Sequence, residues 1–157
     1  MPKIIKGGYK SRMKRYGIVV SRFNDFITKR LLKSCVGELS HCGVKDNEVT
    51  VVWVSGSLEI PVAALMLAQK KYIDAVICLG VVIRGETFHF EIVAHYTAKG
   101  VAEVALQTGK PIIFGVLTTD TVDQAYRRSG SRGDNKGVDA ARAAVEMVNC
   151  LDTLKAV

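Results

Sequence analysis

The segment best suited to chemistry is residues 80–90, which read Gly-Val-Val-Ile-Arg-Gly-Glu-Thr-Phe-His-Phe. An apolar strand ends there at Gly85, Thr87 is a good N-cap, and His89 falls in the first turn of a helix. Free N–H groups and the positive end of the helix dipole at such a helix start suit an anion such as a phosphate. We therefore predict an anionic ligand at this turn and proton transfer by His89. A histidine in this position can also merely pack or cap the helix, and spacing alone leaves both interpretations open.

A nucleotide-binding P-loop is excluded for the same turn. Gly80 and Gly85 have the glycine spacing of that motif, but Glu86 stands where the motif needs a lysine. The segment is therefore interpreted as a turn between a strand and a helix.

Four apolar strands must position this turn. The strand at residues 74–83 is rich in β-branched residues and lacks polar alternation, which is typical of a strand buried on both faces. Similar buried strands are predicted at residues 16–21, 49–54 and 112–117. Strands that alternate with helices predict right-handed crossovers and a doubly wound α/β domain with a parallel sheet. Ligands bind at the carboxyl ends of such strands, so these turns should converge: residues 21–25, 55–59, 81–89 and 114–120.

The helices between the strands carry ordinary start and stop signals. Asn24 is expected to cap the first helix, and Pro61 lies in the first turn of the second. After the fourth strand, residues 118–120 offer caps for a short helix that ends near Arg127. A polar, glycine-rich loop then precedes a last helix at about residues 138–154.

The bulk composition indicates a single domain. A chain of 157 residues with 48% hydrophobic content can bury one core and is too short to suggest two. Its longest apolar runs, residues 60–68 and 75–83, are nine residues each, well short of the roughly 18 needed to cross a bilayer. The N-terminus shows no apolar signal segment, so we expect a cytoplasmic protein without a membrane partner.

The net charge of +7 belongs to an N-terminal arm. Residues 1–15 hold six basic and no acidic side chains, whereas the other 142 residues hold 16 basic and 15 acidic ones. A nucleic-acid-binding protein should carry a basic face with interleaved aromatics on its folded body, and the sequence shows no such pattern. We therefore expect no nucleic-acid partner and interpret the arm as solvated or bound to a protein partner.

No metal site is expected from the cysteines and histidines. The cysteines have no paired C-x-x-C spacing, and the histidines do not cluster with cysteines or carboxylates at zinc-like intervals. The residues concerned are Cys35, Cys42, Cys78, Cys150, His41, His89 and His95. We expect the thiols to be reduced.

Five sequence blocks, in the right order, resemble the lumazine synthase family and extend over residues 16–151. The blocks are Ser21-Arg22-Phe23-Asn24, Gly56-Ser57-Leu58-Glu59-Ile60-Pro61, residues 80–90, residues 111–119 with Phe114-Gly115-Val116-Leu117-Thr118, and Asn135-Lys136-Gly137. The resemblance implies a flavodoxin-like three-layer αβα sandwich with a four-stranded parallel sheet. It also implies one domain over residues 1–157, of which residues 1–15 form the arm.

The resemblance implies a transferase of riboflavin biosynthesis. The family condenses 5-amino-6-(D-ribitylamino)uracil with 3,4-dihydroxy-2-butanone 4-phosphate to 6,7-dimethyl-8-ribityllumazine, without cofactor or metal. His89 matches the proposed proton donor and acceptor. The positions that match the ribitylaminouracil site are Phe23, whose ring would stack on the pyrimidine, Ser57, Leu58, Glu59, Val81, Val82, Ile83 and Phe114. The positions that match the butanone phosphate site are Glu86, through its backbone N–H, Thr87, Arg128 and Lys136.

The resemblance further implies a homo-oligomer built from pentamers. In the family the site lies between neighbouring subunits, with Phe114 and Arg128 offered by the chain next to the one that carries His89. The arm would add a strand to the sheet of a neighbour. Pentamers of the family stay alone, pair as decamers or close into icosahedral shells of sixty subunits, and the sequence leaves this choice open. A functional link to riboflavin synthase is also implied.

Two residues depart from the family pattern, and two other functions remain as alternatives. Ser55 replaces a common proline and Leu58 a common aromatic; both affect pocket shape, but neither removes a group that the reaction needs. A non-catalytic flavin- or lumazine-binding homologue, or a shell-forming one, would not need His89 or Arg128. A flavodoxin-like electron carrier would need a glycine- and hydroxyl-rich loop at residues 21–25, where this chain has no glycine and a bulky ring.

Overall fold

The computed structural model describes residues 1–130 and 132–157 and contains four strands that alternate with helices. The strands are β1 (Tyr16–Ser21), β2 (Val49–Val54), β3 (Ala75–Ile83) and β4 (Ile112–Thr119). The α-helices are α1 (Asp25–His41), α2 (Ile60–Ala68), α3 (His89–Thr108), α4 (Val122–Arg127) and α5 (Lys136–Lys155). Short 3-10 helices are η1 (Asp46–Glu48), η2 (Ser57–Glu59) and η3 (Arg132–Asp134).

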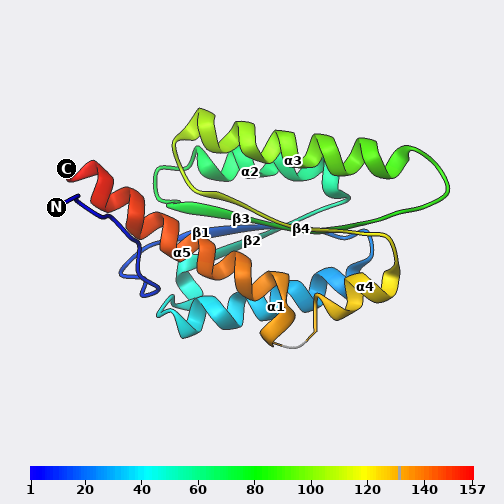
Figure 1. The fold of residues 1–157 in the computed structure, drawn as a ribbon, viewed down its shortest axis with the longest axis horizontal. Helices are drawn as coiled ribbons and strands as arrows, with labels where there is room; N and C mark the ends of the chain where they lie inside the picture. Colours follow the sequence, from blue (N-terminus) through cyan, green and yellow to red (C-terminus); the bar gives the residue numbers. More distant parts are fainter. Residues whose placement is uncertain (131) are drawn as a thin grey trace.

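All four strands are parallel and lie in the order β2-β1-β3-β4. Helices α2 and α3 cover one face of the sheet, and α1, α4 and α5 cover the other (Figure 1). This is the three-layer αβα arrangement that the sequence predicts, so the predicted fold class is confirmed. Because β1 leads to a helix on one face and β3 to a helix on the opposite face, the loops after these two neighbouring strands diverge and leave a crevice between them.

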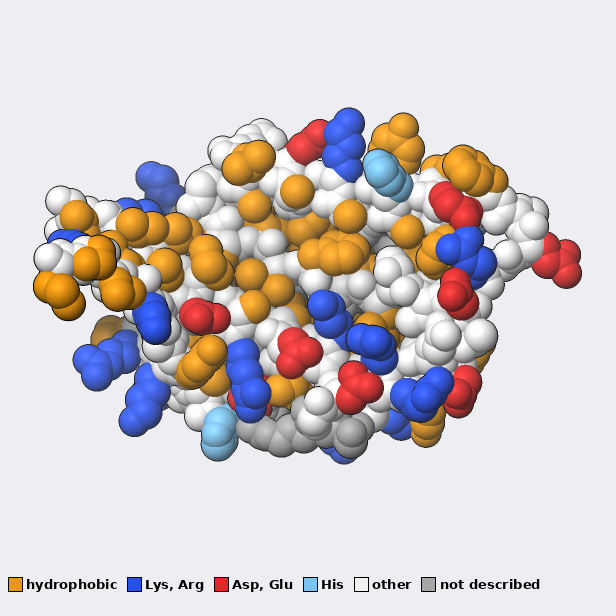
Figure 2. Space-filling model, in the orientation of Figure 1, with side chains coloured by type: hydrophobic (Ala, Val, Ile, Leu, Met, Phe, Trp, Pro, Cys, Tyr) orange, Lys and Arg blue, Asp and Glu red, His pale blue; other side chains and the backbone are white. Residues whose placement is uncertain are grey.

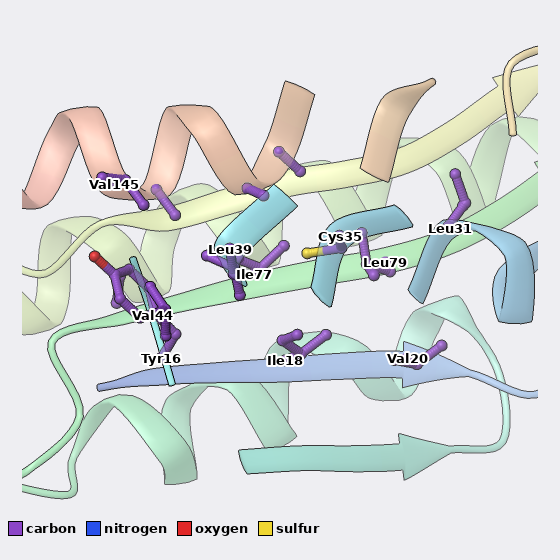
Figure 3. Close-up of a cluster of buried hydrophobic side chains, with 14 of the residues drawn as sticks. Tyr16, Ile18, Val20, Leu31, Cys35, Leu39, Val44, Ile77, Leu79 and Val145 are labelled. Carbon is purple, nitrogen blue, oxygen red and sulfur yellow. The ribbon is translucent and has the colours of Figure 1, made fainter. Parts of the chain in front are cut away.

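Alternate residues of the strands build two hydrophobic cores, one on each face of the sheet. Ile18 and Val20 point toward α1 and α5, where they pack with Ile77 and Leu79 of β3 (Figure 3). Val19 points the other way, into the cluster under α2 and α3. Since both faces of β1 and β3 are fully covered, these strands hold the loops at their carboxyl ends on a rigid base.

Strand β2 is not the buried strand that its apolar sequence predicts. Thr50 is exposed, and Val51 and Trp53 are 38% and 36% exposed. The reason is its place at the edge of the sheet, where only β1 pairs with it. An apolar run therefore predicts burial on both faces only when the strand lies in the centre of the sheet. Here the apolar residues of β2 form an uncovered hydrophobic edge.

Several predicted helix starts differ from the structure. Asn24 does precede α1, but it adopts a left-handed conformation with φ 60° and its side chain caps no N–H group. Helix α3 begins at His89, with Phe88 rather than Thr87 as the N-cap residue. Helix α4 is capped by Thr121, one residue beyond the predicted caps, because β4 continues to Thr119. The sequence signals thus identify the turns at which the helices begin, but they do not identify which side chain caps each helix.

The basic arm is held against its own chain. Asn149 of α5 donates hydrogen bonds from Nδ2 to the carbonyl oxygens of Gly8 and Lys10, at 2.7 and 3.0 Å. Lys14 forms an ion pair of 2.7 Å with Asp152, and this partner raises the pKa of the lysine. Gly7 lies so close to the backbone of Glu146 that no side chain would fit. The arm is thus fixed from Gly7 onward.

We predict opposite stability changes for two glycines that both lie inside helices. A Cβ at Gly100 of α3 would lie 2.6 Å from Cγ of Pro61 in α2, so Gly100→Ala should lower the free energy of unfolding by about 1–3 kcal/mol through overpacking. Gly37 of α1 has no atom within 4 Å of that position, so Gly37→Ala should raise it by about 0.5–1 kcal/mol. Urea unfolding of both variants measures the difference. A stabilised Gly100→Ala protein would mean that α2 and α3 do not touch there.

Candidate active site

Backbone hydrogen bonds bring the loops after the strands together at the carboxyl edge of the sheet. The N–H groups of Arg22 and Phe23 donate to the carbonyl oxygens of Val54 and Ser55, at 2.8 and 3.0 Å, so the loop after β1 is fixed beside the loop after β2. On the other side of the sheet centre, the N–H of Arg84 donates to the carbonyl of Thr119 at 2.9 Å. The convergence of these turns was predicted and is confirmed.

A pocket of about 550 Å³ opens in the crevice between the loops after β1 and β3. Nine of the residues singled out from the sequence line it: Phe23, Ser57, Leu58, Glu59, Val81, Val82, Ile83, Thr87 and His89. Its other lining residues are Ser55, Gly56, Gly85, Phe90 and Val93. The pocket is therefore built from three separate segments of the chain, at Phe23, residues 55–59 and residues 81–93.

The pocket combines a hydrophobic floor with one exposed aromatic ring. Val81 and Val82 at the end of β3 are buried and form apolar surface, whereas Phe23 is 71% exposed and offers a flat face to a ligand. A ring of this kind on a loop does little for the core, and its exposure suits stacking on a planar heterocycle. The arrangement fits a flat ligand that lies against the valines and under or over the phenyl ring.

A close approach of η2 to β3 places hydroxyl groups at the pocket floor. A Cβ at Gly80 would lie 3.0 Å from Oγ of Ser57 and 3.1 Å from Oγ of Ser21, so a larger residue there would force these side chains to shift. Ser57 lines the pocket, and Ser21 is fully buried beside it. Glu59, which is exposed, brings its carboxylate near Gly56 at the pocket rim. Hydroxyl and carboxylate groups are thus available to bind a polar ligand.

His89 is positioned by the first turn of α3 and is exposed to the pocket. Its backbone N–H donates a long hydrogen bond of 3.4 Å to Oγ1 of Thr87, and the N-cap residue Phe88 provides no side-chain cap. The open N–H groups of the turn and the helix dipole favour an anion beside the imidazole. An exposed imidazole next to an anion site can transfer protons to and from a bound substrate.

Four predicted site residues lie outside this pocket. Glu86 is exposed on the same turn but does not line the cavity. Phe114, in β4, is half-buried and packs against the core under α2 and α3. Arg128 and Lys136 line a second hollow, of about 530 Å³, at the end of β4. The single chain therefore does not bring these basic side chains to His89.

The second hollow is basic and lies beside the start of α5. Its lining is Val116, Leu117, Thr118, Thr119, Gln124, Arg127, Arg128, Asp134 and Lys136. The N–H of Lys136 donates to the carbonyl of Arg128 at 2.9 Å, so the two cationic residues are held together. Asn135 caps α5 with Oδ1. Figure 2 shows basic side chains, with acidic ones among them, below a hydrophobic band that crosses the middle of this face.

Some lining residues were not predicted from the sequence. Phe90 and Val93 lie on α3 next to His89, and Val93 is four residues beyond it, on the same side of the helix. Helical spacing from His89 could have identified Val93. Arg127 and Gln124 line the second hollow because α4 follows β4 directly, and only the helix boundaries could have indicated this.

Within residues 1–130 and 132–157, no group of three or more His, Cys, Asp or Glu side chains is placed to hold a metal ion. Cys35, Cys78 and Cys150 are free thiols, and burial raises the pKa of Cys78 to about 12. The described helices include none that is long and apolar enough to span a membrane.

Comparison with known proteins identifies a matching family and, among others, a similar full-length relative. The sequence model of a family described as 6,7-dimethyl-8-ribityllumazine synthase matches residues 13–152. A relative from Desulfotalea psychrophila (strain LSv54 / DSM 12343), named 6,7-dimethyl-8-ribityllumazine synthase, is 48% identical over 155 residues. That alignment covers 99% of this chain and 100% of the relative.

The exposure of Phe23 predicts that its ring serves a ligand and not the core. Phe23→Ala should change the free energy of unfolding by no more than about 0.5 kcal/mol, as at other exposed positions. Ile60, fully buried just beyond η2, is the matched control, and Ile60→Ala should cost about 2–5 kcal/mol. Denaturant unfolding measures both. Equal losses would identify Phe23 as a structural anchor.

Proposed function

Because the chain belongs to the 6,7-dimethyl-8-ribityllumazine synthase family, we propose that its two hollows are the two halves of a shared active site. The chain condenses 5-amino-6-(D-ribitylamino)uracil with 3,4-dihydroxy-2-butanone 4-phosphate to 6,7-dimethyl-8-ribityllumazine, phosphate and water. This is the penultimate step of riboflavin biosynthesis. The observation that carries the site assignment is the pocket in which nine predicted residues, including His89, meet at the carboxyl edge of the sheet.

The pocket at His89 is the half that binds ribitylaminouracil. Its exposed Phe23 ring would stack on the pyrimidine, whose other face would rest on the valine floor. The Ser57 hydroxyl would donate hydrogen bonds to the ribityl hydroxyls and accept them, and the carboxylate of Glu59 would accept them, together with backbone groups of residues 81–83. Leu58 would close the rim as an apolar side chain.

The phosphate of the second substrate would lie at the start of α3. The backbone N–H groups at Glu86 and Thr87, with the helix dipole, favour a dianion, and the Glu86 carboxylate would have to point away from it. Arg128 supplies a fork that matches phosphate oxygens, and Lys136 adds a second positive charge. These cations would reach the phosphate from a neighbouring copy of the chain, and that copy would also supply Phe114 to the half of the site that binds ribitylaminouracil.

His89 would act as the proton donor and acceptor. Attack of the amine on the ketone, loss of water to an imine, elimination of phosphate and ring closure all transfer protons, and none of them requires a nucleophilic side chain. A single imidazole beside the two bound substrates can therefore suffice, and alignment of the reactants supplies much of the acceleration.

The shared site requires a homo-oligomer, which we propose is a homopentamer or an assembly of pentamers. Two features of the single chain support this proposal. Its basic hollow is separate from the pocket with His89, and both edges of its sheet are uncovered. Because the arm is held on its own chain from Gly7 onward, residues 1–6 are the part that would add a strand to the exposed edge at Trp53 of a neighbour. We also propose that the protein is cytoplasmic and is functionally linked to riboflavin synthase.

The activity itself is tested by mixing the two substrates with purified protein and following lumazine fluorescence. The protein should exceed the uncatalysed condensation; a rate no higher than this background would refute the enzyme. His89→Ala should reduce kcat by about 10²-fold because a general acid and base is lost while positioning survives. Arg128→Ala should mainly raise KM for the butanone phosphate, with little change for the uracil.

A mixture of these two variants tests the shared site. Each variant alone has only damaged sites, but co-assembly of equal amounts should restore intact sites at about a quarter of the interfaces, where an intact His89 faces an intact Arg128. Co-expression followed by the fluorescence assay measures the recovery. If co-assembled variants are no more active than the average of the two separate proteins, each site is formed by one chain.

A further inference from the structure

We propose that Arg84 is a positioning residue that fixes the turn carrying His89 through three contacts of its guanidinium. The proposal rests on the proposed role of His89. Arg84 directly follows β3, and its backbone N–H continues the pairing of β3 with β4 by donating to Thr119. The sheet thus fixes the backbone of Arg84, while the side chain of Arg84 reaches beyond the sheet.

The guanidinium joins two elements that are separate in sequence. Its Nε donates to Oδ1 of Asp120 at 2.8 Å, in the turn between β4 and α4. Its Nη1 donates to the carboxylate of Glu91, in the first turn of α3. Its carbon Cζ lies 4.4 Å from the ring centre of Phe90, over the face of the ring. Asp120 is itself held, because its N–H donates to Oε1 of Gln124 at 2.8 Å.

These contacts lie next to His89 in sequence. Phe90 and Glu91 directly follow the histidine, and Phe90 lines the same pocket. The turn itself has little else to hold it, since residues 84–89 are all exposed, the N-cap residue Phe88 provides no side-chain cap, and the hydrogen bond from His89 to Thr87 is long, at 3.4 Å. Gly85 adds backbone freedom. One guanidinium therefore sets the position of the first turn of α3 relative to the sheet.

The network affects geometry more than overall stability. The side chains of Arg84, Glu91 and Asp120 are all substantially exposed, and exposed ion pairs contribute little to the stability of the fold. The neighbouring carboxylates, Asp120 first, raise the pKa of Arg84, so its positive charge persists at every pH at which the enzyme works. A small displacement of a catalytic group can still lower the rate strongly, because proton transfer needs hydrogen-bond contact.

The test compares Arg84→Ala with Lys99→Ala. Lys99 is the matched control because it pairs with Glu103 on the exposed side of the same helix, at 3.8 Å. Arg84→Ala should lower kcat about tenfold with KM values changed less than about twofold, and Arg84→Lys should recover only part of the loss. In the His89→Ala background, Arg84→Ala should cause no further loss beyond about twofold, because it acts through the histidine.

Amide hydrogen exchange gives a readout that does not depend on activity. Peptides that cover residues 85–92 should exchange about fivefold faster in Arg84→Ala, and not in Lys99→Ala, with the melting temperature within about 3 °C of the parent. Unchanged exchange there, a loss that adds fully to that of His89→Ala, or an effect confined to KM would overturn the proposal. If the parent protein shows no synthase activity, the proposed function fails, and the exchange result alone decides whether Arg84 holds the turn.

Discussion

The site depends on the parallel backbone pairing of the strands, because this pairing continues into the loops that follow them. Hydrogen bonds from Arg22 and Phe23 to the loop after β2 extend the ladder of β1 by two residues. A slip of one residue between β1 and β2 would turn Phe23 to the opposite face and break both bonds at once. The buried valine and isoleucine side chains of β1 oppose such a slip, since it would move each of them into the core on the opposite face, where other side chains are packed. The packing of the core thus fixes the position of the Phe23 ring, although this ring is exposed.

The order of the strands explains why one chain holds two separate hollows. The pocket with His89 opens between the neighbouring strands β1 and β3. The loops after these two strands lead to opposite faces of the sheet and form a wall on each side of the pocket. The hollow with Arg128 follows β4, which is an edge strand with no neighbour to supply an opposite wall. An anion bound there by a single chain would stay largely hydrated, and the attraction of the cations would be weak. A second copy that covers the edge would exclude this water, which is a physical reason for a shared site.

Much of the fold could be predicted from the sequence, because central strands and the turns after them have strong local signals. Strand β1 and the turns that hold the nine pocket residues were identified in this way, whereas the roles of most of these residues came from the resemblance to the family. The edge position of β2 could not be, since apolar composition does not record how many neighbours a strand has. The same holds for Arg84, whose partner Asp120 lies 36 residues away and is brought near only by the pairing of β3 with β4. Local patterns thus predict which residues follow strands, whereas contacts between different loops depend on the tertiary structure.

Charge compensation at the turn gives the Arg84 network a second consequence. Glu91 and Asp120 both lie beside the helix start at which we propose that a phosphate dianion binds. Without a cation between them, two carboxylates would repel the dianion and oppose the field of the helix dipole. Arg84 contacts both, so their negative charge is directed away from the ligand into fixed ion pairs. The backbone N–H groups of the turn then remain the dominant positive surface, and they can bind the phosphate without a lysine in the turn itself.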